Sequence, residues 1–175
     1  MARLMVRPIF LKADLPKGSI VGDRPYPDGI DCVWLASDRN GHVAAFVTAG
    51  VGPVPTEALN WERPKVEDVE ELVCGMPHVT AARVLVPVDS FVELAERGLF
   101  VYDWSDVHRT TRDELRAYEL VAIPVSPITV DVLPANLACI ARTVKFVGVI
   151  FADGKTLDVR KQMSCSERAC SGGRA

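Results

Sequence analysis

The clearest pattern along the chain is a pair of apolar runs, Cys32–Ala36 and Val43–Thr48, separated by the polar stretch SDRNGH. Each run has the length of a strand and contains residues that favour sheets. The dipeptide Asn40-Gly41 within the polar stretch supplies the positive φ angles that a tight hairpin turn needs. The pattern therefore predicts a β-hairpin.

A helical pattern follows in the stretch RPKVEDVEELVCGM, which runs from Arg63 to Met76. Pro64 fits the first turn of a helix, and Gly75 with Pro77 ends it. One side of the predicted helix is apolar and carries Val66, Val69, Leu72 and Val73. The opposite side carries four acids, Glu67, Asp68, Glu70 and Glu71. Two interpretations of these acids stay open: a solvated face, or a docking patch for a basic partner.

The remaining apolar runs predict further strands and two more helices. Strands are expected over Leu4–Ala13, Thr80–Val86, Leu99–Trp104 and Arg116–Val125, and helices over Asp89–Gly98 and Asn136–Val144. A second hairpin is expected where Asp153-Gly154 separates Val144–Phe151 from Thr156–Arg160.

Strands outnumber helices in this reading, so the sequence predicts an α+β fold. We expect a mostly antiparallel sheet with β-hairpins and two or three helices on one side. Residues 1–160 are expected to form a single globular domain. Residues 161–175 lose all periodicity and are expected to be a disordered or non-native tail.

Composition narrows the possible functions. The chain has 175 residues, 49% hydrophobic and 25% charged, which is typical of a globular domain. Its formal net charge is −3, with 20 Lys and Arg against 23 Asp and Glu, so we expect no direct binding to nucleic acid. The sequence contains neither a signal-peptide pattern nor an apolar run of membrane-spanning length, so a cytoplasmic protein without membrane contact is expected.

The sequence also lacks the motifs of cofactor and metal sites. The five cysteines, Cys32, Cys74, Cys139, Cys165 and Cys170, show no paired short spacing, so neither a disulfide framework nor a zinc site is expected. No phosphate-binding or dinucleotide fingerprint occurs either. We therefore expect no cofactor and no metal.

The most polar segment is YDWSDVHRTTRDELRAYEL, residues 102–120, whose charged residues include Asp103, Asp106, His108, Arg109 and Arg112. The two acids and the histidine could share a loop and serve in acid–base chemistry, but one His with two acids is an incomplete metal site. Three interpretations stay open: a catalytic loop, a partner-binding loop, or a polar loop stabilised by Asp–Arg pairs. Neither GxSxG nor HExxH occurs in the chain, which disfavours a hydrolase.

Two tryptophans are expected in different environments. Trp34 lies inside an apolar run and is expected in the core. Trp61 lies between Asn60 and a charged residue, and it is the best candidate for an exposed aromatic anchor.

Three segments, DGIDCVWLASDRNGHVAAFVTAGVGPVP, LFVYDWSD and RAYELVAIPVSPITVDVLP, resemble the small immunity proteins of bacterial polymorphic-toxin and contact-dependent-inhibition systems. The resemblance covers residues 4–160 and rests on overall pattern. It implies a cytoplasmic, cofactor-free α+β domain that binds a cognate toxin domain and occludes its active or substrate site.

Two surfaces are therefore candidates for contact with a protein partner. The first is the acidic helix together with the tryptophan before it, namely Trp61, Glu67, Asp68, Glu70 and Glu71. The second is the polar loop with Asp103, Asp106, Arg109 and Arg112. The alternative function is a small-molecule-binding protein or a hydrolase-like enzyme that uses Asp103, Asp106 and His108.

Overall fold

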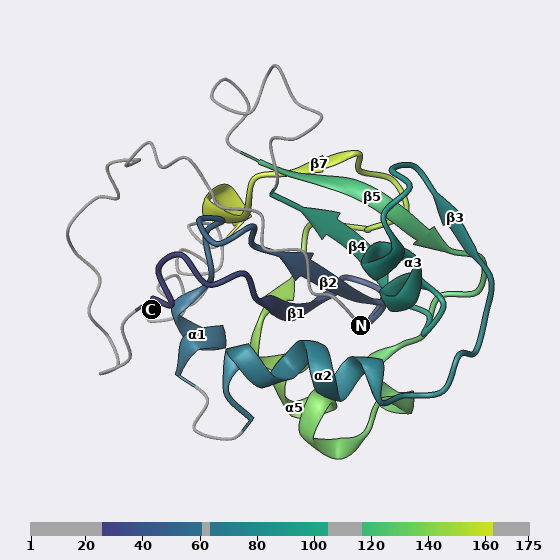
Figure 1. The fold of residues 1–175 in the computed structure, drawn as a ribbon, viewed down its shortest axis with the longest axis horizontal. Helices are drawn as coiled ribbons and strands as arrows, with labels where there is room; N and C mark the ends of the chain where they lie inside the picture. Colours follow the sequence, from purple (N-terminus) through teal and green to yellow (C-terminus); the bar gives the residue numbers. More distant parts are fainter. Residues whose placement is uncertain (1–25, 61–63, 105–116, 163–175) are drawn as a thin grey trace, which may run out of the picture.

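The structure is a computed structural model, and it describes residues 26–60, 64–104 and 117–162 (Figure 1). Four features expected from the sequence lie outside these residues: the strand Leu4–Ala13, Trp61, the stretch from Asp106 to Arg112, and residues 163–175 of the expected tail.

A seven-stranded sheet forms the centre of the molecule. Its strands are β1 (Val33–Asp38), β2 (Val43–Val47), β3 (Ala82–Val84), β4 (Phe100–Asp103), β5 (Tyr118–Pro124), β6 (Lys145–Phe146) and β7 (Thr156–Leu157). The strand order is β3-β5-β4-β2-β1-β6, and β7 pairs with the beginning of β5. The β2–β4 and β1–β6 pairs are parallel and the others are antiparallel. The predicted α+β fold is confirmed, and its sheet is mixed.

The hairpin predicted from Asn40-Gly41 is confirmed. Strands β1 and β2 pair antiparallel, with Ser37 opposite Val43 at the turn. Gly41 has a φ of 81°, the left-handed conformation for which glycine is suited. The buried carboxylate of Asp38 accepts hydrogen bonds from the backbone N–H groups of Asn40 and His42, at 2.8 and 2.9 Å. The polar turn is therefore fixed by a side chain at the end of β1.

The second predicted hairpin, around Asp153-Gly154, is wrong. The two segments flanking that dipeptide do not pair with each other, because β6 joins β1 and β7 joins β5. The Phe151 N–H donates to Asp38 Oδ2 over 3.1 Å, which holds the intervening segment against the first hairpin. The chain does turn near Asp153, but pairing with the distant strands β1 and β5 determines where the segments on either side lie.

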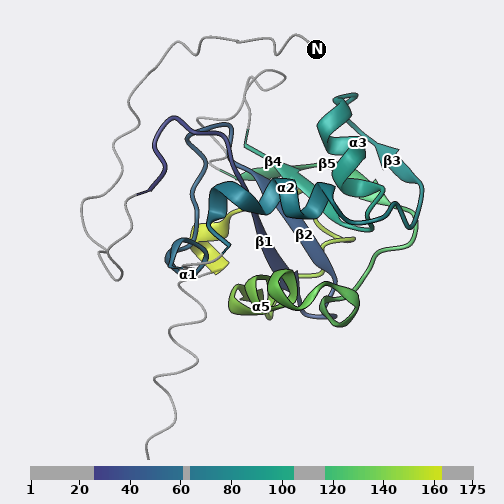
Figure 2. The same ribbon diagram turned by 60° about the horizontal axis from the view of Figure 1, so that its bottom comes forward.

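The predicted helices are present, and three of them cover one face of the sheet. The helical elements are α1 (Thr56–Leu59), the 3-10 helix η1 (Val66–Asp68), α2 (Val69–Cys74), α3 (Asp89–Ala95), the 3-10 helix η2 (Val130–Val132) and α5 (Ala135–Thr143). Val69 of α2, Leu94 of α3 and Leu137 of α5 are buried in one apolar cluster with Leu35 and Val101 of the sheet. Figure 2 shows α2, α3 and α5 together on this side.

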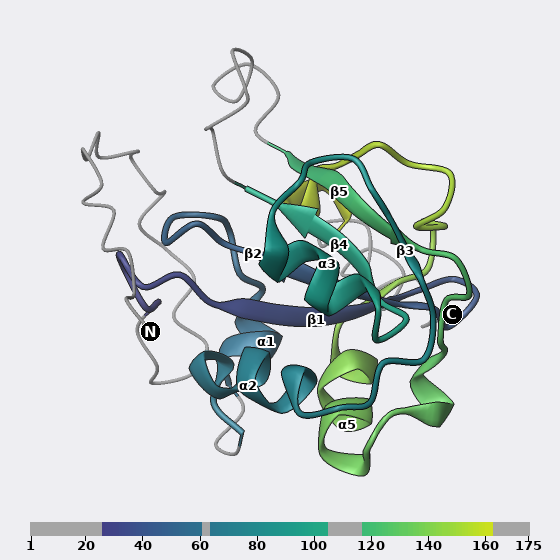
Figure 3. The same cartoon turned by 45° about the vertical axis from the view of Figure 1, so that its right-hand side comes forward.

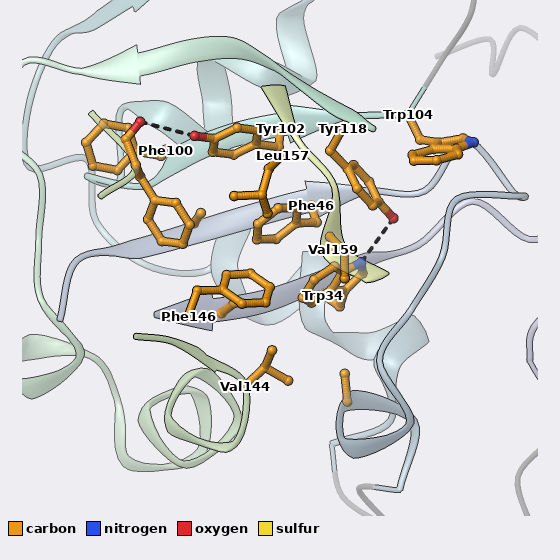
Figure 4. Close-up of a cluster of buried hydrophobic side chains, with 14 of the residues drawn as sticks. Trp34, Phe46, Phe100, Tyr102, Trp104, Tyr118, Val144, Phe146, Leu157 and Val159 are labelled. Atoms are coloured by element: carbon orange, nitrogen blue, oxygen red, sulfur yellow. Dashed lines mark hydrogen bonds between the residues drawn. The ribbon is translucent and has the colours of Figure 1, made fainter. Parts of the chain in front are cut away.

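The opposite face of the sheet is covered by aromatic side chains and by the chain after α5 (Figure 4). The Trp34 ring stacks on Phe46 with centroids 4.2 Å apart, and Phe46 stacks on Tyr102 at 5.2 Å. Phe151 closes over the same cluster. Trp34 has no exposed surface, so the prediction that it belongs to the core is confirmed.

Candidate functional site

The acidic helix has the two-sided character that its sequence predicts. Val66, Val69 and Val73, spaced by three and four residues, are buried against the sheet. Glu67, Asp68, Glu70 and Glu71 are all exposed on η1 and α2. The apolar side therefore anchors the helix, and the carboxylates are left at the surface.

Both ends of this helical segment are held in place. At its beginning, the Lys65 backbone N–H donates to Asp68 Oδ2 over 3.3 Å. At its end, the buried Arg97, two residues after α3, donates from Nη2 to the Cys74 carbonyl over 2.5 Å. A binding surface on a segment held at both ends loses little conformational entropy when a partner binds.

A loop that precedes β1 extends the acidic surface. Asp28, Ile30 and Asp31 are exposed there, and Ile30 leaves 51% of its surface in solvent. This loop is not a simple connection, because Gly29 donates its N–H to the Gly50 carbonyl over 3.0 Å. We call the six exposed acids of the loop and the helix the acidic surface: Asp28, Asp31, Glu67, Asp68, Glu70 and Glu71.

The electrostatics of Cys32 connect the two parts of the acidic surface. The pKa of this thiol is raised to about 11, first by burial and then by the negative charges of Asp31, Glu67 and Glu70, against a lowering by its contact with Thr48. Acids of the loop and acids of the helix therefore both raise the pKa of the same thiol. A thiol with such a pKa stays protonated near neutral pH, which argues against Cys32 as a nucleophile.

Thr48 organises the polar groups beneath this loop. Its buried hydroxyl oxygen accepts hydrogen bonds from the N–H groups of Cys32 and Gly50, at 3.0 and 3.3 Å, and donates to Asp31 Oδ1 over 3.3 Å. The next residue, Ala49, has a φ of 49°, which is uncommon for a residue other than glycine. The loop before β1 and the turn after β2 thus form one rigid unit.

Sequence reasoning singled out no residue of the Asp28–Asp31 loop as a site residue. Asp31 and Thr48 are separated by 17 positions, so their contact depends on strand pairing and has no local signature. The only local signal was an apolar residue, Ile30, between two acids.

Of the second predicted surface, the structure describes only Asp103. This residue ends β4 between β2 and β5, and it is 3% exposed, so its side chain does not lie on an open loop. Its negative charge contributes to raising the pKa of Asp31, whose main cause is burial. Asp106, His108, Arg109 and Arg112 lie outside the described residues, as does Trp61.

The two described histidines have different partners. His42 Nδ1 lies 3.6 Å from Asp38 Oδ2 at the hairpin, whereas His78 lies between Glu93 of α3 and Glu96, the residue that follows this helix. Within residues 26–60, 64–104 and 117–162, no group of three His, Cys, Asp or Glu side chains is arranged to hold a metal ion. Among the same residues, no helix has both the length and the apolar character needed to cross a membrane.

Comparison with known protein families, with curated proteins and with solved structures found no match.

Proposed function

We propose that this protein is a non-enzymatic binding domain that uses its acidic surface to recognise a basic surface on a partner protein. The observation that carries the proposal is the arrangement of six exposed acidic residues on two elements held in place, where Asp31 is bonded to Thr48 and the apolar side of the helix is buried. Such an arrangement needs no folding step before a partner binds.

Charge and apolar contact would have separate roles at this surface. Complementary charge mainly speeds the encounter of two proteins, while a buried apolar side chain contributes more to the lifetime of the complex. Ile30, half exposed between Asp28 and Asp31, is suited to the second role. Trp61 stays a candidate for the same role.

The finer proposal is that the partner is a toxin domain. The resemblance to bacterial immunity proteins supports it, and an acidic surface fits a toxin whose active or substrate site is basic. In this proposal the protein acts in the cytoplasm, without a cofactor, and neutralises the toxin by covering that site.

The test is co-expression with the product of the adjacent upstream gene, followed by purification of the complex and measurement of toxicity. A stoichiometric complex together with loss of toxicity would support the immunity function. A toxic neighbour that neither binds nor is neutralised would contradict that function for this pair.

Charge-matched variants then test the surface itself. Glu67→Gln with Glu70→Gln removes two charges from the acidic surface, and Asp131→Asn with Asp153→Asn removes two exposed charges elsewhere. We expect the first pair to slow association by about 3–10-fold at low salt and the second to leave it nearly unchanged. Ile30→Ala should speed dissociation by about tenfold. Equal effects of the two charge pairs would contradict the assignment of the surface.

A second candidate function rests on the strand ends. Parallel strands β2 and β4 end side by side, and Thr48 and Asp103 lie at these ends beside Asp31. Ligand sites in sheet proteins often lie at the carboxyl ends of parallel strands. The alternative is therefore a small-molecule-binding protein or hydrolase-like enzyme that uses Asp103 with Asp106 and His108. Loss of ligand binding or activity in His108→Ala, with toxin binding absent, would favour it.

A further inference from the structure

Strand β3 forms one edge of the sheet. It pairs with β5 on one side, and no other described strand lies on its other side (Figure 1). Figure 3 shows β3 beside β5 at the rim of the molecule. A strand edge presents backbone N–H and C=O groups that can pair with a further strand. The β3 edge is therefore a place where an extended segment can join the sheet.

The register of the β3–β5 pair determines which backbone groups of this edge point outward. Val125 donates its N–H to the Ala81 carbonyl over 2.8 Å, and Leu85 donates to a carbonyl of β5 over 2.8 Å. In an antiparallel pair, residues that bond to the neighbouring strand alternate with residues whose N–H and C=O point away from it. Ala81 and Leu85 belong to the bonding set. Ala82 and Val84 therefore direct their N–H and C=O groups to the open edge.

One side of the β3 edge is an exposed strip of side chains. From residue 81 to residue 86, exposed positions alternate with half-buried ones, as side chains alternate across a strand. The exposed side carries Ala81, Arg83 and Leu85, and Val125 lies across from Ala81. Leu85 leaves 47% of its surface in solvent, and Val125 leaves 67%. The strip lies on the aromatic side of the sheet, because Ile123, opposite Arg83, packs against the aromatic cluster.

Arg83 gives this strip its charge. Its side chain is exposed, and within residues 26–60, 64–104 and 117–162 no acid forms an ion pair with it. In a strand added to the β3 edge, the residue directly opposite Arg83 would place its side chain on the same side of the sheet. Opposite charges in such a pair stabilise the strands, and like charges destabilise them. The strip therefore favours an acidic residue at the centre of the added strand.

A second copy of this chain does not meet that requirement. When two β3 strands pair antiparallel and all their outward groups are used, Ala82 of each copy bonds with Val84 of the other. This register places the two Arg83 side chains directly opposite each other, where like charges repel. A charged residue on a short edge strand opposes association of this kind. The occupant that fits the β3 edge is therefore a different chain.

We propose that the β3 edge binds an extended acidic segment of a partner protein, which joins the sheet as an antiparallel strand. Its central acid lies opposite Arg83, and an apolar residue two positions earlier lies against Leu85. A large apolar residue two positions later lies against Ala81, whose small side chain leaves room for contact with Val125. Backbone hydrogen bonds supply affinity, and the alternate side chains supply specificity. This inference does not depend on the acidic surface, which lies on other elements.

A peptide titration of the full chain, followed by amide NMR, tests the proposal. The probe is an end-capped peptide with the sequence Thr-Leu-Thr-Glu-Thr-Phe-Thr, and its matched control has Lys in place of Glu. With the Glu peptide, the amides of Ala82 and Val84 should shift to saturation and become protected from hydrogen exchange. The Lys peptide should bind at least about tenfold more weakly.

Two sets of variants separate strand addition from attraction of charge alone. N-methylation of the two threonines that flank Glu removes the peptide N–H groups directed at β3, and it should weaken binding by about tenfold or more. N-methylation of the Glu residue removes an N–H that points away, and it should weaken binding by less than about threefold. In the protein, Arg83→Glu should reverse the preference between the Glu and Lys peptides. Arg39→Glu, which changes another exposed arginine, should preserve it.

Four results would overturn the proposal. They are the absence of saturable shifts at about 1 mM Glu peptide, shifts confined to residues outside β3 and β5, equal binding of the Glu and Lys peptides, and unchanged binding after N-methylation of the threonines. A full chain that sediments as a dimer with the Ala82 and Val84 amides protected would overturn it as well, because a second copy would then occupy the edge.

Discussion

The Trp34 indole N–H donates a hydrogen bond to the Tyr118 hydroxyl oxygen over 3.2 Å, and so joins β1 to β5 across the two strands that lie between them (Figure 4). The same hydroxyl donates to the Pro53 carbonyl over 3.0 Å. Trp34 and Tyr118 lie on the aromatic face, and one hydroxyl there satisfies a buried donor and a partly buried acceptor.

Tyr118→Phe should destabilise the protein by about 1–3 kcal/mol, because it leaves the Trp34 N–H and the Pro53 carbonyl without this partner. Urea unfolding monitored by tryptophan fluorescence and circular dichroism measures the change. Val132→Ala, at an exposed position, should stay within about 0.5 kcal/mol of wild type. A Tyr118→Phe protein as stable as the wild type would show that water replaces the hydroxyl.

Gly52→Ala should cost about 1–3 kcal/mol of stability, because there is no space for a methyl group. A Cβ atom at this position would lie 2.6 Å from the Tyr118 hydroxyl and 2.9 Å from the Thr48 carbonyl oxygen. Gly154→Ala is the matched control, since its nearest neighbour would be 3.8 Å away. Thermal unfolding of both variants should therefore separate them clearly, and equal midpoints would argue against tight packing at Gly52.

Asp38→Asn should destabilise the fold by about 2–3 kcal/mol. Both oxygens of the buried Asp38 carboxylate accept backbone N–H groups, and the amide nitrogen of Asn cannot accept the bond that Phe151 donates. Denaturant unfolding of Asp38→Asn is compared with Asp153→Asn, which changes an exposed acid and should have little effect. Similar losses in both proteins would mean that net charge, not the buried carboxylate, controls stability.

The folded protein should lose stability in alkali, beginning near pH 9. Burial is the main cause that raises the pKa of Cys32 to about 11 from 9.0, and it also raises the pKa values of Tyr26, Tyr102 and Tyr118 above 10.0. Above their ordinary pKa values the unfolded chain binds fewer protons than the folded one, so stability falls as the pH rises.

The ultraviolet absorbance of tyrosinate checks this prediction, because these are the three tyrosines of the chain. The absorbance should rise together with the loss of the circular dichroism signal. Tyrosinate that forms near pH 10 in a protein with native circular dichroism would contradict it.

Local sequence features predicted much of this fold. Asn40-Gly41 predicted its hairpin because turn conformation is a property of adjacent residues. The acidic helix was predictable because apolar and acidic positions alternate with the helical period.

Features that depend on distant residues were not predictable. Asp153-Gly154 resembles a hairpin turn, but β1 and β5 provide the pairing partners for the strands around it. Asp103 looked like part of a polar loop, although its burial follows from having β2 and β5 on either side. Similarly, the contact of Asp31 with Thr48 exists only after β1 and β2 have paired.

The place of β6 in the sheet has a consequence for synthesis on the ribosome. The β1–β2 hairpin can close as soon as residue 47 has emerged. Among the described strands, the other edge of β1 finds its partner in β6, at Lys145 and Phe146, about a hundred positions later. Until then the growing chain carries an unpaired strand edge, which is a template for association between chains. A chain that stalls before residue 145 should therefore depend on chaperones far more than the finished protein does.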